Sequence, residues 1–157
     1  MSQELEFFMG EFRSTYPTDR FYAKNHMWAR TDLELSENGI FRFGFSAYAV
    51  RLLQDVYFLE WSHDEGATLS EKQEFGFIES KKAESDLYAP AKGRLIKLNE
   101  AVLEDPSLIN VDKYENGWLF EMVFAEAPTF LTPDEYLEHL NEVWEVTQKT
   151  IKGQVNQ

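Results

Sequence analysis

The amino-acid sequence predicts one mainly β domain that ends in a longer α-helix, and three observations support this. Short segments rich in aromatic and branched residues alternate in polarity, as half-buried strands do. The dipeptide Asn38-Gly39 separates two such segments and favours a hairpin turn. Near the end, Thr132 to Glu135 has the residue order of a helix start. With 157 residues, of which 13 are Phe, 7 Tyr and 4 Trp, the chain is long and aromatic enough to bury a core.

The first segment predicts a helix. Four apolar residues recur at helical spacing: Leu5, Phe8, Met9 and Phe12. They indicate a short amphipathic helix over residues 2–13, and Pro17 ends any continuation of it. We expect this helix to cover one edge of the domain rather than to dock onto another protein.

The pattern then changes to strands. Phe41, Phe43 and Phe45 alternate with other residue types, which places three rings on one face of a strand. Ser46 is positioned to cap a helix that runs to about Gln54. Strands are expected at 21–23, 26–31, 33–35, 40–45 and 55–61.

The second half predicts further strands, short helical turns and the terminal helix. Segment 118–124 is apolar on both faces except at Glu121, so we expect it in the centre of a sheet. Thr132 as N-cap, Pro133 at the first helical position and Glu135 form a capping box. Before this helix, the sequence predicts a strand at 95–98 and helical turns at 99–103 and at 105–109, the second with Asp105 as cap. In the terminal helix, four residues are expected to face the core: Leu137, Leu140, Trp144 and Ile151. Lys149 and Lys152 fall in its last turns, and Gly153 is the expected C-cap.

Charge and residue types exclude several functions. The formal net charge is -13, from 15 basic and 28 acidic residues, which argues against nucleic acid or an anionic membrane as a partner. The absence of cysteine excludes disulfides, thiolate metal sites and a thiol nucleophile. His26, His63 and His139 have no metal-binding spacing, and no phosphate loop or Ser-His-Asp signature is present, so we expect no catalytic residue, no metal and no enzyme. No signal peptide or membrane span stands out, which predicts a cytoplasmic protein.

One polar segment, from Glu79 to Pro90, lies between strand-like residues 74–78 and 94–98. It predicts a tight, exposed β-hairpin that presents one or two lysines at its tip. Such a tip is most often a solvated turn with no further role. Eight residues of mixed chemistry and fixed spacing set this one apart: Glu79, Ser80, Lys82, Ala83, Ser85, Asp86, Pro90 and Gly93.

These eight residues resemble the lipoyl-attachment hairpin of the glycine cleavage H-protein family, E-S-x-K-A-x-S-D-x-x-x-P followed by G. The resemblance implies that lipoate is attached to Lys82 through an amide and that Lys81 is a neighbour. It also implies that Glu79, Ser80 and Asp86 shape the tip for a lipoate ligase or lipoyl transferase, or contact the lipoyl arm. The arm would swing between partner enzymes, where tethering raises the effective concentration of its cargo.

The resemblance extends over residues 21–140 and implies the fold: a lipoyl-domain-like barrel-sandwich hybrid of two antiparallel sheets, with short helices, an N-terminal helix and a longer C-terminal helix. We treat 1–157 as a single domain with an N-terminal helical extension (1–19), an H-protein-like lipoyl core (20–130) and a C-terminal helix (132–153). We expect a monomer. Further matching residues are Tyr22, His26, Trp28, Gly44, Tyr48, Ala49, Leu53, Asp55, Asn99, Leu103, Pro106, Leu108, Ile109, Asn110, Tyr114, Gly117, Trp118, Leu119, Glu135, Tyr136 and Leu140.

Departures from the family pattern leave the cargo and the partner enzymes open. The family reads H-E-W, with a Glu that helps to hold the amine of the aminomethyl cargo; this chain has Met27, whose thioether cannot pair with a cation. Segments 47–61 and 150–154 resemble the H-like lipoate-binding proteins that serve a heterodisulfide-reductase-like complex in sulfur oxidation, and we favour that partner. The alternative is a glycine cleavage H protein, which carries the aminomethyl group between glycine decarboxylase and aminomethyltransferase. An alternative of another class is an interaction module whose lysine stays unmodified.

Overall fold

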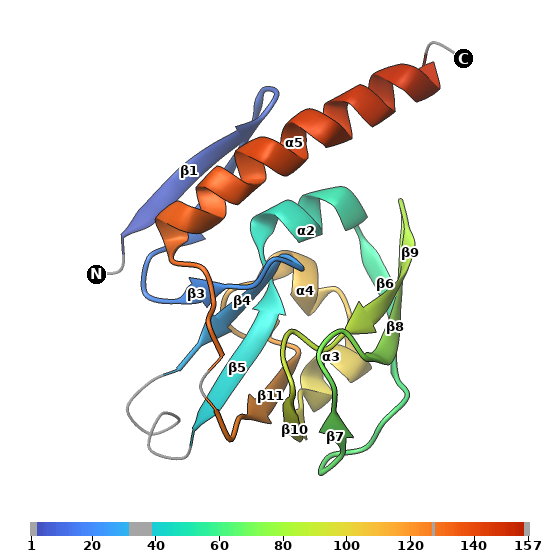
Figure 1. Cartoon of the computed structure of the whole chain (residues 1–157). Helices are drawn as coiled ribbons and strands as arrows, with labels where there is room; N and C mark the ends of the chain where they lie inside the picture. The colour runs from blue at the N-terminus through green and yellow to red at the C-terminus, as the bar shows by residue number, and fades with distance from the viewer. Residues whose placement is uncertain (1–2, 32–38, 127, 156–157) are drawn as a thin grey trace.

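The computed structural model describes residues 3–31, 39–126 and 128–155. Two antiparallel sheets form the body of the molecule, and a third, two-stranded sheet lies outside them (Figure 1). The larger sheet has the order β3 (Phe21–Tyr22), β4 (Met27–Arg30), β5 (Ile40–Phe45), β11 (Phe120–Val123), β10 (Gly93–Leu98) and β7 (Thr68–Leu69). The smaller sheet has the order β6 (Val56–Trp61), β8 (Glu74–Ser80) and β9 (Glu84–Tyr88), and the outer one pairs β1 (Glu4–Met9) with β2 (Phe12–Pro17). The described helices are α2 (Ala47–Leu53), α3 (Glu100–Glu104), α4 (Leu108–Val111) and α5 (Pro133–Val155). The prediction of a mainly β fold built on two antiparallel sheets is confirmed.

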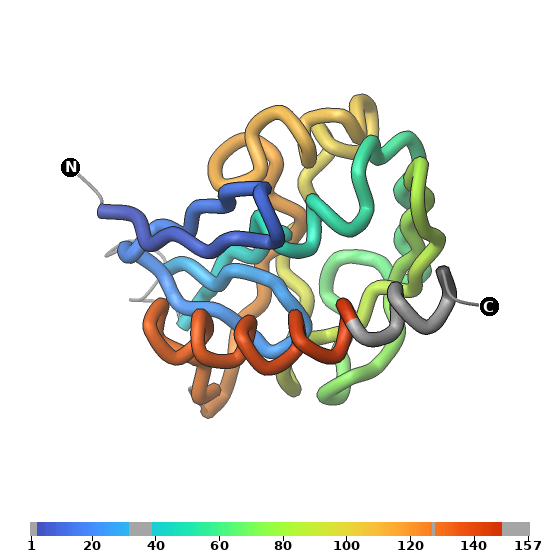
Figure 2. Tube along the Cα trace, turned by 90° about the horizontal axis from the view of Figure 1, so that it is seen from above, coloured from blue at the N-terminus to red at the C-terminus, as the bar shows by residue number. Residues whose placement is uncertain are grey.

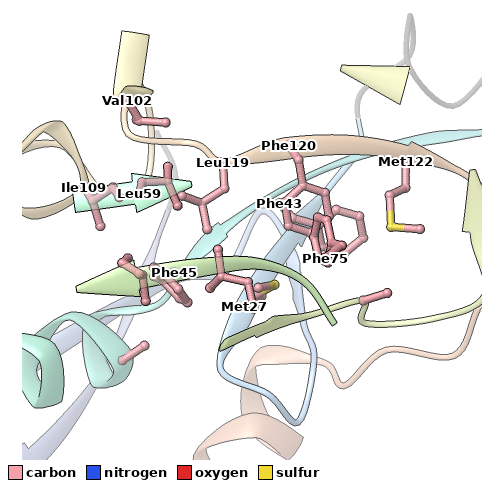
Figure 3. Close-up of a cluster of buried hydrophobic side chains, with 14 of the residues drawn as sticks. Met27, Phe43, Phe45, Leu59, Phe75, Val102, Ile109, Leu119, Phe120 and Met122 are labelled. Atoms are coloured by element: carbon pink, nitrogen blue, oxygen red, sulfur yellow. The ribbon is translucent and has the colours of Figure 1, made fainter. Parts of the chain in front are cut away.

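The larger core joins the two main sheets. Phe43 of β5 stacks on Phe120 of β11 with ring centroids 5.0 Å apart, and Phe75 of β8 meets Phe120 edge-on at 4.9 Å (Figure 3). Phe45 is also buried, and Phe41 packs against the same cluster. The predicted row of three rings on one face of β5 is therefore confirmed, and it supplies the apolar surface on which the smaller sheet rests.

Strand β11 lies between β5 and β10, which confirms its predicted central position. Its acidic residue, Glu121, is buried and forms an ion pair with Arg42 of β5 at 3.3 Å. The Arg42 guanidinium also lies over the ring of Trp118 at 4.4 Å. The charge in an otherwise apolar strand is thus neutralised by its cross-strand neighbour.

The predicted N-terminal helix is wrong, because this segment forms the hairpin β1–β2. Phe7 and Met9 are buried, whereas Phe8 between them is 54% exposed, so the period is two and not 3.6 residues. Gly10 occupies the turn with φ of +67°, which glycine adopts without strain. The apparent helical spacing includes Phe8 and Phe12, which are exposed, so it does not mark a buried face.

Helix α5, the β1–β2 hairpin and α2 enclose a second, smaller core. Figures 1 and 2 show the hairpin and α5 running along the same side of the molecule, with α2 beneath them. Tyr22 and Tyr136 stack at 4.6 Å, and Tyr16 meets Tyr136 edge-on at 5.6 Å. All three rings are buried, so the terminal helix attaches the N-terminal hairpin to the body through aromatic packing.

The start of α5 follows the predicted capping box. The Thr132 N–H donates to the Glu135 side chain at 2.9 Å, and the Glu135 N–H donates to Thr132 Oγ1 at 3.3 Å. The helix continues through Gly153 to Val155, so the prediction of Gly153 as C-cap is wrong. The core-facing positions of Leu137, Leu140 and Trp144 are confirmed by their place in the second core. The predictions for Lys149, Ile151 and Lys152 concern side chains outside those that the structure describes.

Three smaller points complete the fold. Residues 32–38, which include the predicted strand at 33–35 and Asn38, lie outside the described residues. The predicted helical turn at 105–109 starts later than expected, because Ser107 is the N-cap of α4 and Asp105 accepts a hydrogen bond from the Ser107 N–H at 3.2 Å. Among the described helices, none is both long and apolar enough to span a membrane.

Candidate functional site

The predicted lysine-bearing tip is the turn between β8 and β9. Its second arm is Glu84–Tyr88, inside the polar segment; residues 94–98, which the sequence placed after the hairpin, belong to β10 in the other sheet. Lys81 and Lys82 are the two residues at the apex, and both are exposed. Neither ammonium forms an ion pair with any described residue.

Ser80 closes the turn from the inside. Its N–H donates to the Ala83 carbonyl at 2.9 Å, and its hydroxyl oxygen accepts from the Ala83 N–H at 3.1 Å. The hydroxyl itself lies 3.0 Å from the same carbonyl. Ser80 is buried, so its side chain is a structural part of the turn and does not face outward.

The main chain of the tip is also tied to the body of the molecule. The Lys81 N–H donates to the Asp55 carbonyl at 2.8 Å, and the Lys82 N–H donates to the Leu53 carbonyl at 3.3 Å. Both carbonyls belong to the segment that leaves α2. The two lysine side chains are therefore free in solvent while their backbone is held in place, an arrangement suited to presenting one amine at a defined position.

The outer face of the hairpin is acidic. Glu79 lies directly opposite Glu84, and Asp86 lies opposite Phe77. Like charges opposite each other are unfavourable in a sheet, and none of these carboxylates forms an ion pair among the described residues. The rings of Phe58 and Phe77 meet at 6.4 Å on this face. Glu79 and Asp86 thus belong to facing strands of the hairpin near its tip, whereas Ser80 is buried, and their predicted roles in tip recognition or arm contact stay predictions.

A groove of about 340 Å³ opens beside the tip, between β9, α2 and the segment at His26. Met27 is one of its walls and is 2% exposed. Asp86 lines the groove as a carboxylate, and its charge raises the pKa of the Tyr88 hydroxyl 3.4 Å away. The apolar lining residues are Met27, Phe45, Ala49, Leu52, Leu53, Ile78, Ala83 and Leu87.

His26 connects this groove to helix α5. It has φ of +69°, and its Nδ1 lies 2.9 Å from the Tyr136 hydroxyl, which is also 2.8 Å from Ser46 Oγ. Burial, and next the neighbouring His139, lowers the pKa of His26 from 6.5 to about 4. His26 is therefore neutral near pH 7 and acts as a hydrogen-bonded link between the groove wall and the second core.

Comparison of the sequence with models of protein families identifies a matching family. The family model of the glycine cleavage H-protein matches residues 20–149. The chain belongs to this family. Its members are non-catalytic carriers that bind lipoate covalently on a lysine.

Individual H proteins are similar over most of their length. The glycine cleavage system H protein of Rubrobacter xylanophilus is 36% identical over 126 residues, which is 80% of this chain and 95% of that protein. That of Psychrobacter cryohalolentis is 38% identical over 130 residues, 81% of this chain and 99% of that protein. The crystal structure of a glycine cleavage system H protein from Mycobacterium marinum is 32% identical with a TM-score of 0.69, and covers 81% of this chain and 98% of its own. These similarities support the glycine cleavage alternative over the sulfur-oxidation partner that the sequence favoured.

The sequence found the residues at the tip but missed what holds them. The carbonyls of Leu53 and Asp55 carry no residue-specific signal, because any residue has a backbone carbonyl. The link from His26 to Tyr136 joins positions 110 residues apart. Helical spacing in α5 predicted core-facing positions for other residues: Leu137, Leu140, Trp144 and Ile151.

Proposed function

We propose that this chain acts as a glycine cleavage H protein, with lipoate amide-linked to Lys82, and serves as a carrier between glycine decarboxylase and aminomethyltransferase. The observation that carries the proposal is the exposed Lys82 side chain on a turn whose backbone is tied to α2. This turn contains residues that match the lipoyl-attachment motif of the family. Relatives with this name are 36–38% identical over about four fifths of the chain.

The residues around Lys82 fit a lipoyl group. The ammonium has no carboxylate partner among the described residues, so a ligase can reach it without breaking an ion pair. The groove next to Ala83 has an apolar lining and the volume to receive a hydrocarbon chain. When bound, the group supplies a dithiolane on a long flexible arm; the protein supplies presentation, positioning and shelter from water.

The acidic outer face supports the choice of partners. Glu79, Glu84 and Asp86 surround the tip in a chain of net charge -13. Such a face steers the carrier toward enzymes whose active-site entrances are basic.

Met27 favours a second candidate, an H-like carrier of a heterodisulfide-reductase-like sulfur-oxidation complex. The groove wall carries a buried thioether where the family pattern has a carboxylate. Among the groove residues near the tip, Glu84 and Asp86 are the acids that remain for a cationic cargo. Lower affinity for an amine-bearing cargo is the consequence that separates the two candidates.

Mass spectrometry tests the attachment site. We expect intact protein treated with lipoate ligase, ATP and lipoate to gain one lipoyl group, and peptide sequencing to place it on Lys82. The Lys82→Arg variant should lose all modification with unchanged thermal unfolding, whereas Lys81→Arg should be modified like the parent. If the Lys82→Arg variant is still lipoylated, the assignment of Lys82 as the attachment site is wrong. If the parent protein stays unmodified, the alternative of an interaction module without lipoate is favoured.

Reconstitution tests the partner enzymes. Lipoylated protein should support glycine-dependent CO₂ exchange by glycine decarboxylase. The Met27→Glu variant should raise the yield of loaded carrier, because it restores a carboxylate beside the arm. Failure of both proteins in this assay, together with complete lipoylation, favours the sulfur-oxidation partner.

A further inference from the structure

A second pocket, of about 300 Å³, lies between the β1–β2 hairpin, helix α2 and the loop after α4. Three basic residues line it, Arg13, Arg51 and Lys113, and no acidic residue is among its described lining residues. The chain as a whole has 28 acidic and 15 basic residues, so this basic pocket has the opposite charge to the rest of the surface. Like charges around one cavity repel each other unless a carboxylate of the protein or a bound anion neutralises them.

Two of these cations are not neutralised by the protein. Arg13 pairs with Glu6, and the arginines at 20, 30 and 42 also pair with carboxylates. Arg51 has no ion pair with a described residue; its guanidinium lies 4.1 Å from the centre of the Phe12 ring. Stacking of this kind orients the planar group and leaves its N–H edges free for another ligand. Lys113 likewise lacks a carboxylate partner in the described chain, and its Nζ lies 5.9 Å from the Tyr114 ring centre.

Neutral hydrogen-bonding groups complete the lining. Gln54 and Thr15 also line the basic pocket, and neither side chain forms a hydrogen bond with a described residue. Asn110 differs: it accepts from the Val56 N–H at 2.9 Å and donates to the Gln54 carbonyl at 2.6 Å, which fixes the floor of the pocket. The free side chains of Gln54 and Thr15 each include a hydrogen-bond donor, and clustered donors are what an oxyanion requires.

One wall of the pocket is an addition to the family fold. Arg13 and Thr15 belong to β2, before residue 20, where the family match begins. The relatives from Rubrobacter and Psychrobacter are matched over 95% and 99% of their own length by about four fifths of this chain. The hairpin that closes the basic pocket therefore precedes the part of the chain that the family model matches. The pocket is distinct from the groove beside the lysine-bearing tip, which has other lining residues, among them Leu52 and Leu53.

We propose that the basic pocket binds the phosphoryl group of a small phosphorylated compound. The volume of about 300 Å³ suits a phosphoryl group with a small substituent. Arg51 can meet two phosphoryl oxygens with its guanidinium fork, while Lys113 neutralises a third. Since Arg51 and Gln54 lie on either side of Leu53, the ligand holds the same segment whose carbonyl anchors the backbone of Lys82. The site is independent of whether Lys82 carries lipoate.

Calorimetric titration of the full chain with inorganic pyrophosphate tests the site, with sodium chloride at equal ionic strength as the blank. We expect saturable binding of one pyrophosphate. Arg51→Gln and Lys113→Gln should each weaken it roughly tenfold or more, because each removes a charge-assisted contact. Arg94→Gln is the matched control: Arg94 is an exposed arginine without an ion pair among the described residues, and it lines a different pocket. Its affinity should equal that of the parent.

Three outcomes overturn the proposal. The first is the absence of saturable pyrophosphate binding. The second is that Arg94→Gln weakens pyrophosphate binding as much as Arg51→Gln does, which indicates general charge attraction. The third is tighter binding of citrate than of pyrophosphate, which assigns the pocket to carboxylates. Amide NMR spectra of each variant show whether it is folded, and in the parent the pyrophosphate-induced shifts should centre on Ala47, Arg51 and Gln54. Shifts centred on Lys92 and Arg94 instead place the anion elsewhere and also contradict the assignment.

Discussion

Two hairpins of the described chain, β1–β2 and β8–β9, are attached to the same helix in different ways. The β8–β9 hairpin is tied to the end of α2 by backbone hydrogen bonds from Lys81 and Lys82. The β1–β2 hairpin is attached to α2 and α5 by side chains, chiefly the buried ring of Tyr16. Backbone attachment leaves the tip side chains free to evolve a motif, whereas side-chain attachment uses them as core. This is why one hairpin is recognisable from its residue types and the other is not.

The largest effect is expected from removing the ring that joins α5 to the N-terminal hairpin. Tyr136→Ala deletes a fully buried aromatic side chain that stacks on Tyr22, and should lower the free energy of unfolding by about 3–5 kcal/mol. Urea unfolding measures the loss, and amide exchange should rise far more in β1–β2 than in β8–β9. Tyr136→Phe is the control that keeps the ring and removes the hydroxyl contacts to His26 and Ser46, at a cost of about 1–3 kcal/mol. An equal rise of amide exchange in both hairpins of Tyr136→Ala would contradict the different attachment of the two hairpins.

The next effect is a pH dependence that acts on the link between the two regions. The unfolded chain binds a proton on His26 near its ordinary pKa of 6.5, whereas the folded protein binds it only near pH 4. Between these values the unfolded state holds more protons, so stability is complete above about pH 7 and falls as the pH decreases toward 4, by up to about 3 kcal/mol. Thermal unfolding at pH 7.5 and 5 measures it. His26→Asn should reduce the difference in stability between the two pH values, because Asn tolerates the positive φ and does not titrate in this range. His63→Gln is the control and should leave that difference unchanged. If His26→Asn shows the same pH dependence of stability as the parent, other groups cause it.

A smaller effect is expected at the lipoyl tip itself. Ser80→Ala removes the side-chain contacts with Ala83 and should cost about 1–2 kcal/mol, because the Ala83 N–H loses its side-chain acceptor. It should also slow lipoylation of Lys82 while Lys82 remains the modified residue. Ser70→Ala, at an exposed serine outside this hairpin and its groove, is the matched control and should leave both properties unchanged. A normal lipoylation rate in Ser80→Ala shows that the ligase does not depend on the closed turn.

The sequence predicted most of the body and the position of the tip. Alternation at Phe41, Phe43 and Phe45 and the apolar run of β11 were sufficient, because a strand buried against a second sheet must place its apolar residues in this order. The capping box at Thr132 was equally predictive, since both of its hydrogen bonds form between residues three apart. The prediction for the N-terminal segment was wrong because this segment is short and has aromatic residues on both faces. Phe8 and Phe12 stay exposed, and only contact with α5 decides that Phe7 and Met9 are the buried pair.

By itself, the sequence determined the mainly β class, the terminal helix and the family motif at Glu79 to Pro90, because these depend on local order and fixed spacing. Only the tertiary structure decided how the tip is held, which carboxylates share its outer face, and that Arg13, Arg51 and Lys113 surround one pocket. Those features join distant parts of the chain through backbone carbonyls and through side chains on three separate elements. Residue types and local spacing carry no record of such contacts, since they arise from packing between elements and not from the order of residues within one.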